Sequence, residues 1–131
     1  MSGPETDYGA WVAKAEHDLL NIENNLVAAQ VPWDTICFHA QQAAEKLLKA
    51  FLVFHGQAAP RIHDLVALLT ACVQIDGSLG ELGADCAGLT DYAVVSRYPT
   101  DEVYEPGEAA GRAATAAARR VHAAVLARLP Q

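Results

Sequence analysis

Four polar side chains recur at the spacing of one helix face in the segment 37–50. His39, Gln42, Lys46 and Lys49 stand at i, i+3, i+7 and i+10, so they share one stripe of a helix. The stripe offers an imidazole, an amide and two ammonium groups, which could bind a nucleotide phosphate or the carboxylates of a partner. The same spacing fits a solvated face with Gln side chains that bond across a bundle. The sequence leaves both interpretations open.

Two further basic groups lie outside this stripe. His63 precedes Asp64 at the predicted start of a helix, where a carboxylate caps free N–H groups and can orient the imidazole. Arg97 stands at the predicted end of another helix. There it could bond free carbonyls, form a buried ion pair with Glu45 or Asp18, or bind a phosphate. Structural roles are the simpler interpretation of both residues.

The sequence predicts no metal site and implies no cofactor. The five histidines lack a His-x-x-x-His spacing, and there is neither a Gly-x-Gly-x-x-Gly run nor a phosphate-loop Gly-Lys-Ser/Thr. Three cysteines without a close pair fit buried apolar roles in a reducing compartment. No apolar run approaches about 18 residues, and the N-terminal residues lack the pattern of a signal peptide. We therefore expect a cytoplasmic protein with no membrane span.

Composition favours helices in one domain. The 131 residues suit a single unit spanning 1–131, and the hydrophobic fraction of 52% is rich in Ala and Leu. The net charge of -7 argues against a basic platform for nucleic acid, so we do not expect RNA as a partner.

Apolar periodicity and breaker residues divide the chain into five segments. They predict an all-α fold, an antiparallel helical bundle of about five helices with a four-helix up-down core. The first two expected helices span about 7–29 and 32–55, and Gly56 ends the second. The third is capped by His63 or Asp64, and the fourth is capped by Ser78 and ends before Arg97. The fifth runs from about 106 to 129.

Three motifs together suggest a family. The run Phe38-His39-Ala40-Gln41-Gln42-Ala43-Ala44-Glu45-Lys46 is followed by Pro60-Arg61-Ile62-His63-Asp64-Leu65 and then by Arg97-Tyr98-Pro99. In order and spacing they resemble the HEPN family. The resemblance implies a compact helical bundle, commonly a homodimer. It also implies a gene beside a minimal nucleotidyltransferase, and several such pairs act as toxin and antitoxin.

The resemblance further implies a possible ribonuclease activity. Ribonuclease members carry an Arg followed, after four to six residues, by a His at the dimer interface, and they cleave RNA without a metal. If Arg97 holds the arginine position, the histidine position falls on Glu102, Val103 or Tyr104. A Glu cannot replace imidazole without a large rise of its pKa, so we expect no activity of that kind.

Three functions remain as hypotheses. The leading one is a non-catalytic interaction module, homodimeric and paired with a minimal nucleotidyltransferase in a toxin–antitoxin-like or defence system. The second is a nucleotide-binding domain that uses the stripe and Arg97 for phosphate contacts. The third is a metal-independent RNase toxin with a displaced site, for example Arg97 facing His63.

Overall fold

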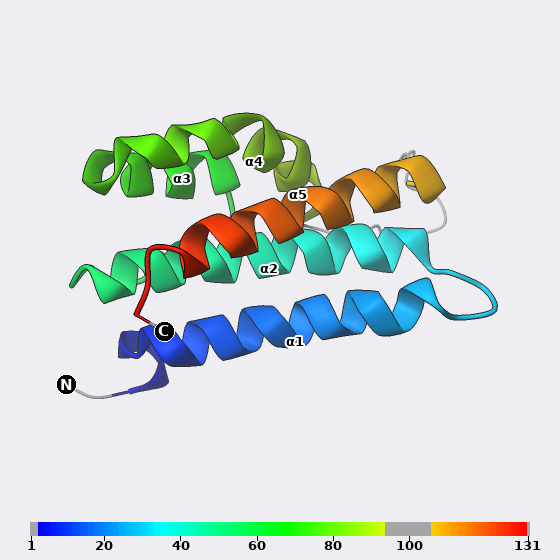
Figure 1. Cartoon of the computed structure of the whole chain (residues 1–131), viewed down its shortest axis with the longest axis horizontal. Coiled ribbons are helices and arrows are strands. Elements are labelled where there is room, and N and C mark those ends of the chain that lie inside the picture. Colours follow the sequence, from blue (N-terminus) through cyan, green and yellow to red (C-terminus); the bar gives the residue numbers. More distant parts are fainter. Residues whose placement is uncertain (1–2, 94–105, 131) are drawn as a thin grey trace.

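The computed structural model describes residues 3–93 and 106–130, and this part of the chain contains helices and no strand (Figure 1). The predicted all-α fold is confirmed. The five α-helices are α1 (Tyr8–Leu26), α2 (Trp33–Phe54), α3 (Leu65–Ile75), α4 (Gly83–Leu89) and α5 (Glu108–Leu126). Three short 3-10 helices are η1 (Pro4–Thr6), η2 (Gly77–Leu82) and η3 (Thr90–Ala93).

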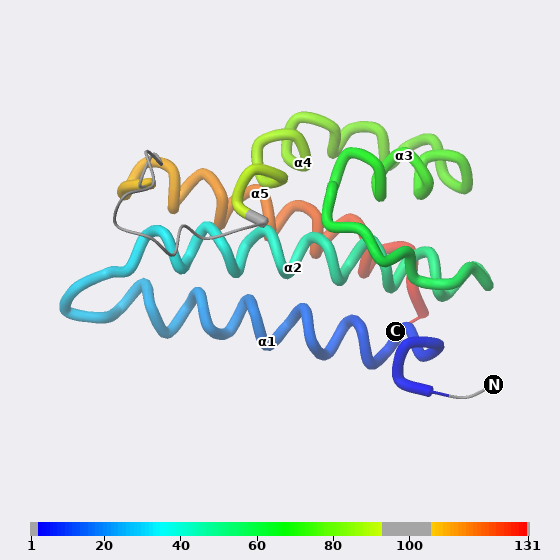
Figure 2. The backbone as a smooth tube through the Cα atoms, turned by 180° about the vertical axis from the view of Figure 1, so that it is seen from behind, coloured from blue at the N-terminus to red at the C-terminus, as the bar shows by residue number. Residues whose placement is uncertain are grey.

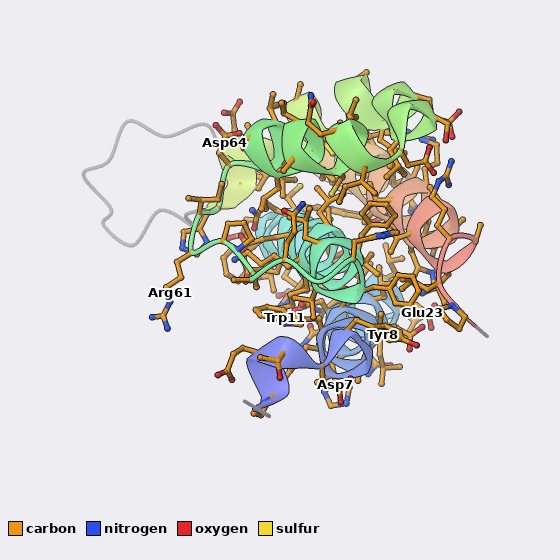
Figure 3. All side chains as sticks on the ribbon, turned by 90° about the vertical axis from the view of Figure 1, so that its left-hand side faces the viewer. Asp7, Tyr8, Trp11, Glu23, Arg61 and Asp64 are labelled. Atoms are coloured by element: carbon orange, nitrogen blue, oxygen red, sulfur yellow. The ribbon has the colours of Figure 1, made fainter. Side chains whose placement is uncertain are left out.

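Helix α2 is the centre of the bundle. Seen end-on in Figure 3, it is surrounded by α1, α3 and α5. It runs antiparallel to α1, while the chain colours of Figures 1 and 2 show that α5 lies alongside α2. Because neighbours cover α2 on most sides, thirteen of its residues are buried.

The ends of α2 follow the predicted signals. Pro32 is the residue just before the helix rather than its first residue. Beyond Phe54, Gly56 adopts a φ of 83°, which is the left-handed conformation that glycine tolerates. The amides of Gly56 and Gln57 donate to the carbonyls of Val53 and Leu52, both at 3.0 Å. This is the hydrogen-bond pattern of a glycine-terminated helix, so the predicted stop at Gly56 is confirmed.

The segment after α3 differs from the prediction of one helix capped by Ser78. Asp76, not Ser78, accepts the first amide bond, and the chain forms η2, α4 and η3 in succession. Four glycines between 77 and 88 explain the interruption, because each lowers helix stability by about 1 kcal/mol. The predicted helix end before Arg97 lies outside the described residues.

Helix α5 approaches α2 very closely at one glycine. A Cβ atom built on Gly111 would overlap Cε3 of Trp33, the first residue of α2. The guanidinium of Arg112 then stacks over the same indole, 5.2 Å from its centroid. The Ala-rich inner face of α5, including Ala114, Ala118 and Val121, is buried.

None of the helices in the described ranges has the length and apolar character required to cross a membrane.

Candidate functional site

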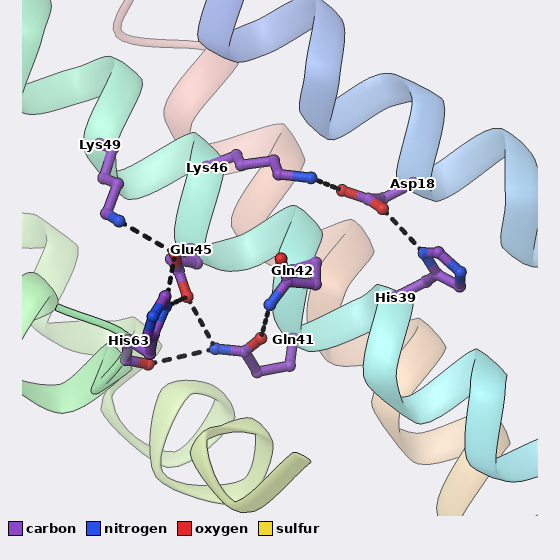
Figure 4. Close-up of polar contacts among 8 residues, drawn as sticks. All are labelled: Asp18, His39, Gln41, Gln42, Glu45, Lys46, Lys49 and His63. Carbon is purple, nitrogen blue, oxygen red and sulfur yellow. Dashed lines mark hydrogen bonds and ion pairs between the residues drawn. The ribbon is translucent and has the colours of Figure 1, made fainter. Parts of the chain in front are cut away.

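The first polar cluster joins α1 to α2 through Asp18. One carboxylate oxygen of Asp18 lies 2.8 Å from Nδ1 of His39, and the other lies 2.6 Å from Nζ of Lys46 (Figure 4). Asp18 is only 7% exposed, whereas the side chains of His39 and Lys46 are 21% and 23% exposed. The buried charge is therefore matched by basic groups whose outer parts still meet solvent.

Helical spacing explains this arrangement. His39 and Lys46 are seven residues apart, which is about two turns, so both point from α2 towards α1. An ionised Asp18 requires Nδ1 of His39 to donate, and the ring then presents Nε2 as its outward nitrogen. The cluster can therefore orient the imidazole of His39. In doing so it occupies Nδ1 of His39 and one N–H of the Lys46 ammonium.

The second cluster is built around Glu45 and lies deeper. Glu45 and Lys49 are each 5% exposed, and Nζ of Lys49 donates to Oε2 of Glu45 at 2.9 Å. Nδ1 of His63 lies 2.9 Å from Oε1, and Nε2 of Gln41 donates to the same oxygen at 3.2 Å. Gln41 also donates to the main-chain carbonyl of His63 at 3.1 Å, so the cluster holds the α2–α3 connector in place.

The electrostatics of this cluster favour an ionised Glu45. Burial alone would raise the pKa of Glu45, but hydrogen bonds from Lys49, His63 and Gln41 outweigh burial and hold the pKa below its ordinary value. Lys49 also lies over the ring of Trp11, 5.6 Å from its centroid. The buried ammonium thus has both a carboxylate and an aromatic face beside it.

The predicted stripe is divided between these two clusters. His39 and Lys46 belong to the Asp18 cluster and Lys49 belongs to the Glu45 cluster. Gln42 bonds neither carboxylate; its Nε2 donates to Oε1 of Gln41 at 2.7 Å. The interpretation of the stripe as a solvated face is wrong at Lys49, which is buried, because α1 and the connector cover this side of α2.

The predicted capping role of Asp64 is confirmed, whereas the suggestion that it orients the imidazole of His63 is wrong. Asp64 caps α3 by accepting the amides of Val66 and Ala67, so it does not orient the imidazole, and Glu45 takes that role. Arg97 lies outside the described residues, and its suggested ion pairs stay predictions. Asp18 and Glu45 already have other basic partners in the described chain.

Sequence reasoning named Asp18 and Glu45 only as possible partners of Arg97, and it missed them as the carboxylates that organise the two clusters. By residue type Asp18 belongs to the polar side of its helix, yet it stands three residues after Ala15 and four before Ile22, both of which are buried. That spacing was the available signal, because it puts the carboxylate on the apolar stripe.

Other parts of the described chain show less chemistry. No group of three or more His, Cys, Asp or Glu residues within residues 3–93 and 106–130 could hold a metal ion. Burial raises the pKa of Cys72 and that of Cys86 to about 12, so both thiols stay protonated. A pocket of about 630 Å³ lies between α4 and α5, away from both clusters; it is lined by Glu81, Leu82, Ala84, Asp85, Arg120, Ala123 and Ala124.

Comparison with known proteins gives a consistent result. The HEPN domain model matches residues 8–128. The crystal structure of TT1696 from Thermus thermophilus is similar with a TM-score of 0.80 and 26% identity, over 93% of this chain and 98% of that one. The structure of ST0689, an archaeal HEPN homologue, is similar with a TM-score of 0.72 and 26% identity, over 93% and 97%. No curated protein sequence matches significantly.

Proposed function

The chain belongs to the HEPN domain family, and on that premise we propose that it acts as a non-catalytic interaction module. In this proposal it forms a homodimer and works with a separate minimal nucleotidyltransferase, in a toxin–antitoxin-like or defence system. Its task is to bind its partner, and it does not cleave RNA.

The observation that carries this proposal is the missing imidazole of the ribonuclease motif. Residues 102, 103 and 104, where the histidine would stand after Arg97, are Glu, Val and Tyr. Two histidines of the described chain, His39 and His63, are each bound through Nδ1 to a carboxylate that joins two parts of the fold. Each imidazole joins two elements of the fold, α2 to α1 through His39 and the connector to α2 through His63, and this suits packing and partner binding.

Charge supports the same proposal. The net charge of -7 repels a phosphate backbone, and three of the carboxylates included in it, Asp101, Glu102 and Glu105, follow Arg97 closely in the sequence. An acidic chain of this kind has little electrostatic affinity for RNA. In this proposal its basic side chains make short-range contacts instead of attracting a nucleic acid over a distance.

Exposed apolar side chains support association. Leu20 on α1 and Val27 directly after this helix are 53% and 85% exposed. Phe54, Ile62 and Val66 are 37%, 40% and 44% exposed. Such side chains gain free energy when a second surface covers them. Light scattering at micromolar concentration should give the mass of a dimer, and a monomer would contradict this part of the proposal.

Co-expression tests the partnership directly. We expect a tagged form of the chain to co-purify with the minimal nucleotidyltransferase encoded beside it, and the purified chain alone to leave total RNA intact. Absence of such a gene and of any captured partner would count against the proposal. Robust RNA cleavage that disappears with Arg97→Ala would overturn it.

A nucleotide is the second candidate ligand, and one observation favours it. His39 and Lys46 are basic, half-buried and held in place, which suits phosphate contacts. However, Asp18 lies between them and cancels one positive charge. Calorimetry with ATP, AMP and GTP decides this question, because affinities of millimolar or weaker for all three would exclude nucleotide binding.

A further inference from the structure

The outer layer of the fold contains one helix that carries no charge. Helix α3 lies at the edge of the bundle, above α2 in Figure 1, and it begins beside Asp64 in Figure 3. Its eleven residues, Leu65–Ile75, include no Asp, Glu, Lys, Arg or His. The other four described α-helices each contain at least one charged side chain. An uncharged helix at the surface is therefore an exception in this acidic chain.

The apolar character of α3 extends around the whole helix. The bundle covers one side, which consists of Leu65, Leu68, Leu69 and Cys72. The opposite side, which we call the α3 outer face, has the spacing i, i+1, i+4, i+7 and i+8 and consists of Val66, Ala67, Thr70, Val73 and Gln74. Val73 is half-buried and the other four residues of this face are exposed. A helix that is apolar on all sides ordinarily lies inside a protein, so the outer face indicates a surface that a second molecule covers.

Hydrogen bonding makes the α3 outer face more apolar than its residue types indicate. The hydroxyl of Thr70 donates to the main-chain carbonyl of Val66 at 2.8 Å, so Thr70 adds its methyl group to the face. Val66 is 44% exposed and adds the largest uncovered apolar area. On this face the amide of Gln74 is the polar group that remains.

The carboxylates at the two ends of α3 are already bonded. Asp64 accepts main-chain amides of the first turn, and Asp76 pairs with the guanidinium of Arg128 at 2.9 Å. Neither carboxylate is therefore a bare charge beside the outer face. A molecule that covers this face does not have to remove water from an unpaired ion.

Charge identifies a second copy of the chain as the molecule that fits this face. Two copies with a net charge of -7 repel each other, and the buried centre of a protein interface is depleted of charged residues. A two-fold axis sets the same face of both copies against itself, so that face must be complementary to itself. An uncharged apolar face meets this condition, whereas a partner with a basic surface is attracted to the acidic sides of the chain.

The size of α3 requires that neighbouring elements take part. The helix is about 16 Å long, and a stable interface takes about 800 Å² from each partner, which is more than one such helix supplies. Ile62 is 40% exposed just before α3, and η2 packs directly against it. Gly77 and Gly80 of η2 are exposed, and a Cβ atom at either position would meet nothing within 4 Å. Packing within the chain does not require glycine there, and a second backbone can approach closely at such positions.

We propose that two copies of the chain associate through their α3 outer faces about a two-fold axis, with Ile62 and η2 at the border of the contact. This inference rests on the proposed function, since it gives the homodimer of that proposal its surface.

A charge placed on the α3 outer face tests the proposal. Val66 is the second residue of α3, where glutamate suits the helix dipole, so Val66→Glu should remain folded, with an unchanged far-ultraviolet circular dichroism spectrum. In the dimer this variant brings a carboxylate from each copy into an apolar contact. We expect a dimer dissociation constant at least about a hundredfold weaker, one tenfold step from each copy, in sedimentation equilibrium. A dissociation constant equal to that of the wild type would overturn the inference.

Leu20→Glu is the matched control. It changes the net charge by the same amount at an apolar side chain that is 53% exposed, but it lies on α1. The dissociation constant should stay within about threefold of the wild-type value, because the added charge is distant from the contact and screened. Dissociation by Leu20→Glu and not by Val66→Glu would place the interface on α1 and contradict the proposal.

Cross-linking gives a second readout that does not depend on breaking the dimer. The three native cysteines, Cys37, Cys72 and Cys86, are buried, so a cysteine at an exposed position is the thiol that reacts first. Thr70 is the middle residue of α3, and Thr70→Cys with a short bis-maleimide should give covalent dimers at least about tenfold faster than Leu20→Cys does. Equal rates for the two variants would show that the α3 faces do not meet.

These outcomes separate the inference from the proposed function. If the wild type is a dimer that Val66→Glu leaves intact, the homodimer stands and the α3 surface is wrong. If Val66→Glu separates the dimer but no nucleotidyltransferase co-purifies with the wild type, the α3 surface stands and the partnership is wrong. A wild type that is a monomer at micromolar concentration overturns the homodimer and the α3 surface together.

Discussion

The buried ion pair of α2 can be tested by a double-mutant cycle. Glu45 and Lys49 are both 5% exposed and are joined at 2.9 Å, so neither charge is fully hydrated once its partner is removed. Methionine is an unbranched helix former of similar length, and it can replace either residue without a cavity as large as that left by alanine. The cycle comprises Glu45→Met, Lys49→Met and the double variant.

The two single variants should differ in cost. Removing one member of a buried pair typically costs about 3–5 kcal/mol, because the other charge is left uncompensated. Glu45→Met should fall in this range, since it also deprives Gln41 and His63 of their acceptor. Lys49→Met should cost less, about 1–3 kcal/mol, because the carboxylate keeps two hydrogen bonds.

The double variant should be less destabilised than the sum of the two single variants predicts. With both charges gone, apolar packing replaces the pair, and such replacements are often neutral or stabilising. We expect a coupling free energy of about 1–3 kcal/mol. Urea denaturation followed by circular dichroism at neutral pH measures all four proteins, which should remain folded because domains of this size have about 5–15 kcal/mol of stability.

An exposed pair of the same spacing provides the matched control. Glu108 and Arg112 are also four residues apart and bonded at 2.8 Å, but both side chains are 61% exposed. Their cycle should give a coupling below about 1 kcal/mol, since solvent screens the charges. If the Glu45–Lys49 cycle is additive within about 0.5 kcal/mol, the buried pair does not stabilise the fold.

Acid stability, a close helix contact and thiol reactivity provide three more tests. Because the fold lowers the pKa of Glu45, the ionised carboxylate should stabilise the protein above its ordinary pKa of 4.5, and this stabilisation should be lost as the pH falls through and below that value. The urea midpoint of Glu45→Gln, measured against pH, should therefore fall less steeply in acid than that of the wild type. Gly111→Ala should lower the free energy of unfolding by about 1–3 kcal/mol through its clash with Trp33, and a loss of the same size in a Trp33→Leu background would contradict that cause. Cys72 and Cys86, whose pKa values burial raises to about 12, should resist iodoacetamide in the native protein and react once it is unfolded; complete labelling of the native chain within minutes would show that these thiols are accessible.

The helices could be predicted from the sequence because their information is local. The apolar spacing around Ile22, the proline before Trp33 and the glycine after His55 each act within one or two turns, and the observed bounds agree within a few residues. The segment 77–93 was harder, because its apolar pattern favours a helix while its glycines oppose one. The outcome depends on how η2 and α4 pack against α3 and α5, which is not local information.

The sequence points to the basic residues of the candidate site but not to the carboxylates that they contact. The sequence identified the basic members of both clusters, since His39, Lys46 and His63 stand out by type and spacing. It could not identify Asp18 and Glu45 as their partners, because those contacts span 18 to 28 residues and depend on how α1 and the connector lie against α2. Burial is decided by these neighbours, and so a helix face that looks polar in sequence can lie inside the bundle.

The buried charges of α2 have a consequence beyond stability. An apolar residue at position 45 would pack adequately against the connector, but it would let the connector settle in several positions, since dispersion contacts have little directionality. Glu45 instead accepts from Lys49, Gln41 and His63 at defined angles, and Gln41 binds the main chain of His63 as well. Two bonds from α2 to one residue fix both the path of the connector and the orientation of its imidazole.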